Sequence, residues 1–376
     1  MSGVTLGVWQ FTENSPRLIV PVIDKESPLE ATQRYINSFK ENPLLRELVP
    51  KAYQNIELYS LQGSFLSEWP KSSRPKLAFI ANWAEDLEPN GERINRNIQR
   101  FQQAGSDPFV IPISADLGLS LQETRAFHLE LARHFDILVA LGGDHIATEL
   151  YQKQNMTSPE DWNSNITRDR SEFNLISAYK TLPRLKKGLF FGICRGHQFN
   201  GLIDGHELRS IGKAEADHFN STGDSATTKQ TWHPVSVEES SLLARLLRGF
   251  LHPLKGNRFF SKENEAENFS NRVGVVVNSI HQQVVILRED AISRPVAFHS
   301  PTMIEALESV PDENNKIISL SIQFHGEFPQ DISKNEEFSL MGFALIKRII
   351  ALSRRNLALS RSSKNACLPL FRFNSF

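Results

Sequence analysis

The chain has 376 residues, of which 40% are hydrophobic and 23% are charged, and its formal net charge is −1. This length and composition fit an ordinary globular protein built around one large domain. The near-zero charge gives no electrostatic basis for binding nucleic acid or an anionic membrane surface, so we expect neither partner.

Two cysteines occur in the whole chain, Cys194 and Cys367. This number excludes a disulfide framework and fits a reducing compartment. No basic segment followed by an apolar one opens the sequence, and no apolar run approaches the roughly 18 residues of a membrane span. We therefore expect a cytoplasmic protein.

Residues 1–74 are predicted to be an N-terminal extension that precedes the main domain. Residues 17–23 are apolar enough for a strand, and Ser27 with Glu30 three residues later forms a capping box that starts a helix. The prolines and serines of residues 69–75 predict a linker. The extension packs on the main domain, covers its site, or offers a surface for a homo-oligomer or a partner protein; the sequence leaves these alternatives open.

From residue 75 the sequence alternates short apolar strands with amphipathic helices. Strands are predicted at residues 76–80, 109–113, 136–141 and 189–193, and helices at 92–104 and 121–135. Continuously apolar strands separated by helices indicate a parallel sheet that is covered on both faces. We therefore expect an α/β fold of three layers, α/β/α, with a central, mostly parallel sheet of the flavodoxin-like kind.

The main domain is predicted to span residues 75–353, and its second half changes character. Strands are predicted there at residues 232–237, 272–278 and 317–324, and helices at 241–247 and 336–352. Residues 354–376 contain five basic residues and no acidic one. That composition predicts a flexible basic tail.

Residues 188–198, GLFFGICRGHQ, predict a buried strand, a tight turn with Cys194 at its apex, and a helix N-terminus. Glycines two residues before and after the apex allow the strand and the helix to pack closely while the thiol stays exposed. A helix N-terminus also stabilises a thiolate. Because a lone cysteine beside an apolar strand is usually a small buried hydrophobe, the interpretation as a nucleophile depends on a base elsewhere in the chain.

His325 is the candidate base, since it follows a predicted strand and precedes Glu327 by two residues. Residues i and i+2 of an extended segment lie on the same side, so the carboxylate can orient the imidazole. Backbone N–H groups of Gly143 and Arg195 are the candidate donors for an oxyanion. The Arg195 side chain binds a substrate carboxylate or pairs with an internal acid, and both alternatives stay open.

Six segments taken in order resemble motifs of the class I glutamine amidotransferase-like superfamily. They are Gly142-Gly143-Asp144-His145 with Leu150-Tyr151, Arg168-Asp169 with Glu172, residues 192–198, residues 278–282 (NSIHQ), Ile304-Glu305-Ala306, and residues 323–327 (QFHGE). The resemblance covers roughly residues 76–350. It is closest to the γ-glutamyl hydrolase branch (peptidase C26-like), which includes the γ-glutamyl-γ-aminobutyrate hydrolases, because an arginine at position 195 is typical of that branch.

The resemblance implies a Cys194–His325–Glu327 triad that cleaves γ-glutamyl amide bonds through a γ-glutamyl thioester. It also implies a small γ-glutamyl substrate whose α-amino and carboxylate end is held by four residues, with no metal and no organic cofactor. These four are Gln198, Asn278, Ser279 and His281. The histidines His197, His206 and His218 have spacings that match no helix or strand face, which argues against a metal site.

The sequence departs from the family pattern at Gly201, His206, Gln282 and Gly326, where the family usually has asparagine, glycine, histidine and proline. None of these positions belongs to the triad, but most shape the surroundings of the substrate, so the identity of the released amine stays open. Two alternative functions also remain. One is a glutaminase subunit that supplies ammonia to a partner synthase; the other is a catalytically silent scaffold on the same fold.

Overall fold

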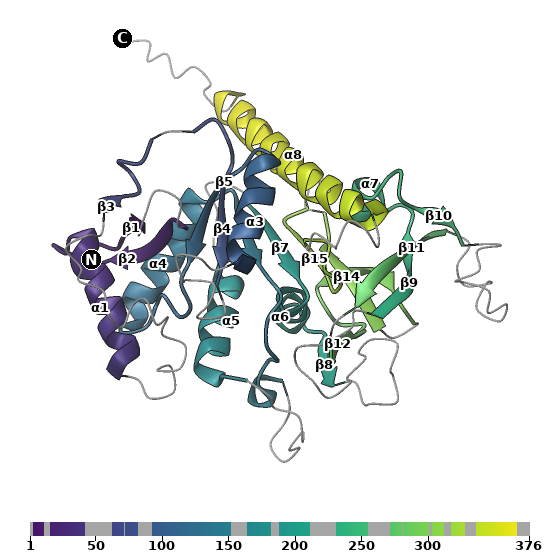
Figure 1. Ribbon diagram of the computed structural model, residues 1–376, viewed down its shortest axis with the longest axis horizontal. Coiled ribbons are helices and arrows are strands. Elements are labelled where there is room, and N and C mark those ends of the chain that lie inside the picture. The colour runs from purple at the N-terminus through teal and green to yellow at the C-terminus, as the bar shows by residue number, and fades with distance from the viewer. Residues whose placement is uncertain are drawn as a thin grey trace, which may run out of the picture.

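In the computed structural model of the protein, one mixed sheet carries helices on both faces (Figure 1). The structure describes residues 3–10, 16–41, 62–70, 72–81, 92–151, 164–181, 188–210, 231–254, 271–279, 281–300, 303–311, 317–327 and 336–366. The strand order is β10-β11-β9-β13-β14-β15-β7-β6-β4-β5-β2-β1-β3, and β12 pairs with both β14 and β8.

The centre of the sheet is parallel, as the sequence predicts. Its strands are β15 (Ser319–Ile322), β7 (Leu189–Ile193), β6 (Ile137–Ala140), β4 (Lys76–Ile80) and β5 (Asp107–Ile111), and each pairs in parallel with the next. Because β6, β7 and β15 are neighbours, the segments that follow their carboxyl ends meet at one edge of the sheet.

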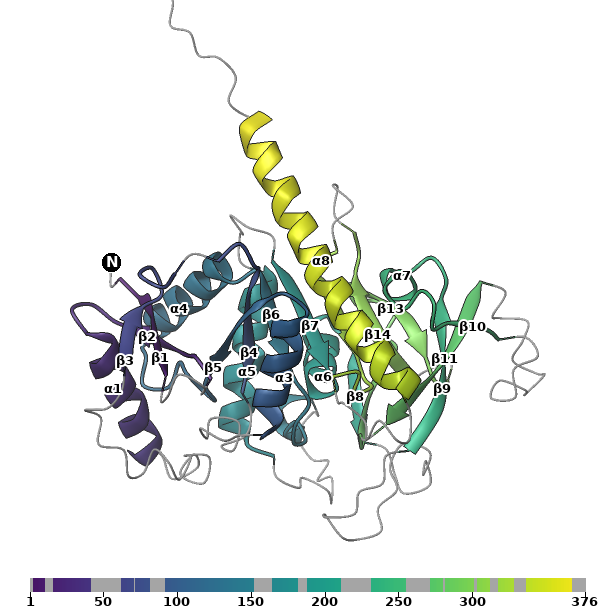
Figure 2. The ribbon, with the colours of Figure 1, turned by 45° about the horizontal axis from the view of Figure 1, so that its top comes forward.

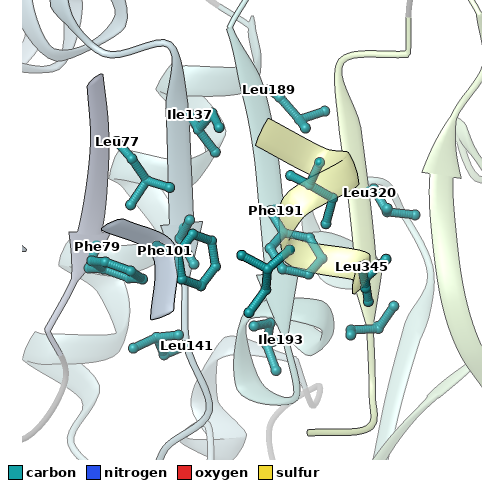
Figure 3. Packing of buried hydrophobic residues seen from close by; sticks show 14 of the residues in the cluster. Leu77, Phe79, Phe101, Ile137, Leu141, Leu189, Phe191, Ile193, Leu320 and Leu345 are labelled. Carbon is teal, nitrogen blue, oxygen red and sulfur yellow. The ribbon is translucent and has the colours of Figure 1, made fainter. Parts of the chain in front are cut away.

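Helices cover both faces, which confirms the three-layer α/β/α prediction. One face is covered by α1 (Pro28–Glu41), α3 (Glu92–Gln103) and α8 (Glu336–Ala366), and the other by α4 (Leu121–His134), α5 (Ile166–Thr181) and α6 (Arg195–Ile203). Figure 3 shows Phe191 and Ile193 of β7 packed with Phe101 of α3 and Leu345 of α8. The alternate residue Phe190 points into the opposite layer, since successive strand residues face opposite sides.

The N-terminal residues extend the sheet beyond its parallel centre. β2 (Leu18–Val22) pairs in parallel with β5, β1 (Thr5–Gln10) pairs antiparallel with β2, and β3 (Gln62–Phe65) pairs with β1. The predicted capping box is present, because Ser27 N–H donates to Glu30 at 2.7 Å and Glu30 N–H donates to Ser27 Oγ at 3.2 Å. Within the predicted linker, Trp69 packs on the domain, since its ring lies edge-on to Phe109 with 6.2 Å between ring centres.

The second half of the sheet is antiparallel. It contains β8 (Glu207–Ser210), β9 (Thr231–Glu238), β10 (His252–Pro253), β11 (Arg272–Ser279), β12 (Gln283–Ile286), β13 (Ser293–Phe298) and β14 (Met303–Ser309), with the short helix α7 (Leu242–Leu246). The sequence predicts β9, β11 and α7, and the family-like segment Ile304-Glu305-Ala306 lies in β14. It misses β8, β10, β12 and β13, which are short or partly polar and obtain their strand geometry from their partners.

The C-terminal helix is longer than predicted. The helix expected at 336–352 continues as α8 to Ala366, so the prediction of a flexible tail from residue 354 is wrong up to that point (Figure 2). Packing explains why the helix continues past residue 352: Ser353 and Asn356 are buried, and Arg354 donates to the Gly105 carbonyl at 2.6 Å. None of the described helices combines the length and apolar character needed to cross a membrane.

Candidate active site

Cys194 lies at the turn between β7 and α6, at the N-cap of the helix, with φ 51° and ψ −102°. A residue with a side chain rarely adopts a positive φ, and such conformations cost about 1–3 kcal/mol where the surroundings impose them. The turn is fixed because Cys194 N–H donates to the Ile322 carbonyl at 2.8 Å. The flanking glycines are required by contact: a Cβ on Gly192 would lie 2.6 Å from the Gly196 carbonyl oxygen. The expected strand–turn–helix elbow is therefore present, but the thiol is not exposed as expected, because Cys194 is buried.

His325 follows β15 and faces this elbow. Its Nδ1 lies 2.8 Å from Glu327 Oε1, and both side chains are buried. Burial lowers the pKa of His325, but the Glu327 carboxylate and the Cys194 sulfur, through charge and hydrogen bonding, raise this pKa to about 10. The protonated imidazole is thus the stable form between the sulfur and the carboxylate.

Two residues hold the backbone of the segment that carries His325 and Glu327. Asn278, at the end of β11, accepts from His325 N–H at 3.0 Å and donates to the His325 carbonyl at 3.4 Å. Arg100 of α3 donates to the Glu327 carbonyl at 2.6 Å. The base is therefore positioned from the antiparallel strands on one side and from a helix on the other.

The segment after β6 approaches both groups. A Cβ on Gly142 would lie 2.5 Å from His325 Cε1 and 3.4 Å from Cys194 Cβ, so only glycine fits there. Gly143 comes next and is partly exposed. We refer to residues 142–147 as the oxyanion loop, after the donor that the sequence predicts at Gly143; at Gly142 this loop lies close to the Cys194 side chain.

Arg195 follows the cysteine, and its side chain is fully buried. Its guanidinium donates to Asp169 Oδ1 at 2.5 Å and to Glu172 Oε2. Burial lowers the pKa of Arg195, but these two carboxylates raise it above its ordinary value. Of the two alternatives left open by the sequence, the structure shows pairing with internal acids.

Asp169 also connects this pair to the oxyanion loop. Its Oδ2 accepts from Ala147 N–H at 2.8 Å, and its Oδ1 accepts from Arg168 Nε at 3.1 Å. Arg168 Nη1 in turn lies 3.2 Å from Asp144 Oδ2. The buried carboxylate of Asp169 thus binds both Arg195 and the oxyanion loop.

The four predicted substrate-binding residues all lie near this edge of the sheet, but their contacts differ from one another. Gln198 Nε2 donates to the Gln283 carbonyl at 2.9 Å, and His281 Nδ1 lies 3.2 Å from the same carbonyl oxygen. His281 Nε2 is 3.8 Å from Glu305 Oε1. Ser279 is buried at the end of β11, next to Asn278, whose side chain binds the backbone of the base.

The histidines considered as metal ligands have other partners. Both ring nitrogens of His197 are hydrogen-bonded, to Ser321 Oγ at 2.9 Å and to the Ile304 carbonyl at 3.2 Å, and burial lowers the pKa of His197 to about 3. His206 Nδ1 accepts from Arg288 N–H at 3.3 Å, and His218 lies outside the described residues. Among the described residues, no group of three or more His, Cys, Asp or Glu side chains could hold a metal ion.

Sequence reasoning missed three contributions to the site. Gln283 binds the oxyanion loop, Arg100 binds the Glu327 carbonyl, and Asn278 binds the base backbone rather than standing free for a ligand. Their partners are distant in sequence, so no local spacing predicts them. The sequence offers one signal for two of them: Asn278 begins the fourth family-like segment, and Gln283 directly follows that segment.

The fold and the site define a three-layer α/β protein with a cysteine at a strand–helix elbow beside a histidine–carboxylate pair. The profile of the Peptidase C26 family matches residues 86–327, so the chain belongs to that family. This match confirms the resemblance to the class I glutamine amidotransferase-like superfamily, and it classes the protein as a hydrolase of amide bonds.

Solved structures with a similar arrangement have low sequence identity to this chain. They include a Thermoplasma acidophilum protein described as part of a GMP synthase (14% identity, 78% of this chain and 100% of that chain covered, TM-score 0.43). Another is the glutaminase domain of Trypanosoma brucei CTPS with bound acivicin (16%, 75% and 94%, TM-score 0.44). A third is a glutamine amidotransferase from Thermotoga maritima (15%, 77% and 99%, TM-score 0.36). No curated protein matches the sequence.

Proposed function

We propose that the protein is a cysteine-dependent hydrolase of γ-glutamyl amide bonds that acts through a γ-glutamyl thioester. The observation that carries the proposal is the arrangement of Cys194, His325 and Glu327. The sulfur stands at a strained elbow, and the imidazole beside it is bound to a carboxylate at 2.8 Å, with its pKa raised to about 10. A cysteine paired with a protonated histidine is an activated nucleophile.

In the first half of the reaction the Cys194 thiolate attacks the γ-carbonyl carbon, and the C=O electron pair moves to oxygen. Backbone N–H groups of Gly143 and Arg195 stabilise that oxyanion. His325 then gives its proton to the leaving nitrogen, the C–N bond breaks, and the amine departs. Glu327 keeps the imidazole oriented, since it binds Nδ1 and leaves Nε2 to face the sulfur.

In the second half water attacks the thioester carbon. His325, now neutral, takes one proton from this water, the C–S bond breaks, and glutamate is released with a γ-carboxylic acid that loses the other proton to solvent. The Cys194 thiolate and the His325 imidazolium are then restored. Gln198, Ser279 and His281, with Asn278 beneath the base, form the part of the site where we place the glutamyl group.

The test is a single-turnover assay with mass spectrometry of the intact protein. The panel contains glutamine, γ-glutamyl-γ-aminobutyrate, γ-glutamyl polyamines and glutamyl folates. We expect a transient glutamyl adduct on the wild type and none on Cys194→Ser, with Cys367→Ser as the matched control that keeps the adduct. The fastest amide identifies the amine. Absence of both turnover and adduct across the panel contradicts the proposal.

The same panel separates the two alternative functions. A glutaminase subunit would release ammonia from glutamine and react poorly with the larger amides, and its rate would rise when a partner synthase is added. A silent scaffold would form no adduct, and Cys194 would be alkylated no faster than Cys367.

A further inference from the structure

Gln283, the first residue of β12, has no part in the steps above, yet its side chain is bound to the oxyanion loop. The residue is 3% exposed. Ile146 N–H donates to Gln283 Oε1 at 3.0 Å, and Gln283 Nε2 donates to the Ile146 carbonyl at 3.0 Å. The same Nε2 donates to the Tyr151 hydroxyl at 3.0 Å.

These bonds satisfy both backbone groups of Ile146, a buried residue three positions after Gly143. A buried N–H or C=O group that is left unpaired destabilises the structure, so the loop is held where the Gln283 amide can reach it. The next residue, Ala147, is held independently by Asp169 at 2.8 Å. Two side chains from different elements, β12 and α5, thus fix the end of the oxyanion loop.

The backbone carbonyl of Gln283 acts on a second element. It accepts from Gln198 Nε2 at 2.9 Å. A carbonyl only accepts, so the Gln198 amide must turn its NH₂ toward Gln283 and its oxygen to the other end. An amide oxygen held in this way is an acceptor suited to an ammonium group.

We propose that Gln283 is a positioning residue that sets the oxyanion loop against Cys194 and orients Gln198 as an acceptor for the α-ammonium group of the substrate. The inference rests on the proposed function. Gln283 acts through Ile146 and Gln198 and does not touch the reacting atoms. Because a misplacement of about 1 Å can cost about 100-fold in rate, loss of this amide has a measurable effect.

An exposed glutamine outside the site provides a matched control. Gln122 lies in the first turn of α4, is exposed, and takes no part in these hydrogen bonds. With L-γ-glutamyl-p-nitroanilide as the probe, we expect Gln283→Met to lower kcat about 10- to 100-fold and to raise KM. Gln122→Met should stay within about twofold of the wild type. Alkylation of Cys194 by iodoacetamide needs no oxyanion donor, so its rate should change less than about twofold in both variants.

Hydrogen exchange at the Ile146 amide tests the contact without any turnover. It should be faster in Gln283→Met than in the wild type, and unchanged exchange overturns the inference. A fall in Cys194 alkylation that parallels kcat also overturns it, because the damage would then reach the thiol itself. If Gln283→Met does not fold, Gln283→Glu retains an acceptor for Ile146 N–H; exchange there should stay slow while kcat falls, and an unchanged kcat overturns the inference.

Failure of the proposed function gives a different result. A wild type that neither turns over the probe nor forms a glutamyl adduct contradicts the γ-glutamyl chemistry. The Ile146 exchange still decides whether Gln283 holds the loop.

Discussion

The two sides of the site are held by different kinds of interaction. The elbow side consists of Arg168, Asp169, Glu172 and Arg195, four buried charged residues joined by ion pairs. The base side contains the single buried pair of His325 with Glu327, and the His325 backbone is held by the neutral amide of Asn278, which binds only backbone groups. Buried ion pairs depend on every member, since removing one leaves an uncompensated charge, whereas a neutral amide contributes a few local hydrogen bonds. We therefore expect the elbow side to govern stability and the base side to govern proton chemistry.

The largest effect should come from changing Cys194, whose sulfur is the proposed nucleophile. Cys194→Ser should reduce kcat about 10⁴-fold or more, because serine is not ionised by a neighbouring imidazole as readily as cysteine. Its free energy of unfolding should change little, since the two side chains are similar in size. Steady-state kinetics and urea unfolding measure the two quantities. If Cys194→Ser retained its activity, Cys194 would not be the reacting group that the two sides position.

The next largest effect should be on the elbow side. Asp169→Asn keeps the shape of the side chain but removes the charge that faces Arg195 and Arg168. We expect the free energy of unfolding to fall by about 3–5 kcal/mol, measured by urea denaturation. A fall of less than about 1 kcal/mol would mean that the buried network is not what holds this side.

The same acid-to-amide change on the base side should affect catalysis more than folding. Glu327→Gln removes the charge that stabilises protonated His325, so kcat should fall about 100-fold or more. The pKa of His325, which is about 10 in the wild type, should fall in the variant. Titration of the histidine resonances by NMR measures it. An unchanged pKa would contradict the role assigned to Glu327.

This pKa also predicts how stability depends on pH. His325 binds its proton more tightly in the folded protein, with a pKa of about 10, than at its ordinary value of 6.5. Its contribution to the free energy of unfolding is therefore complete below about pH 6.5 and is lost as the pH rises to about 10. Unfolding at pH 6, 8 and 10 should show this loss in the wild type and a smaller one in Glu327→Gln.

Asn278→Ala should have a smaller effect. It removes both side-chain bonds to the His325 backbone, and we expect about 1–3 kcal/mol of destabilisation with a reduced kcat. Kinetics and urea unfolding on the same samples compare it directly with Asp169→Asn. Equal losses of stability for the two variants would break the proposed contrast between the sides.

The smallest effect should come from outside the site. Ser27→Ala removes the capping bond at the start of α1, which costs about 1 kcal/mol. Thermal unfolding measures the loss, and kcat should stay at the wild-type value because α1 packs on the β1–β3 end of the sheet. A large change in kcat would show that residues 1–74 act on the site.

Most of the core of the fold is predictable from the sequence, because each signal is local. Short apolar runs define β4 to β7, a capping box starts α1, and glycines on both sides of Cys194 define the elbow. His325 and Glu327 are two residues apart, and strand geometry predicts that they face the same way; the pair does meet, but in the turn that follows β15 and not within a strand. These features depend on periodicity and on sterics within a few residues.

The partners that surround these features depend on contacts between elements that are far apart in the sequence. Arg195 could not be assigned to internal acids, since Asp169 is 26 residues away in sequence, and Gln283 contacts Ile146 across 137 residues. The joining of β1–β3 to the sheet and the continuation of α8 past residue 352 likewise depend on distant neighbours. A hydrogen-bond partner of a buried polar group is selected by which elements pack together, and no local pattern of residues carries that information.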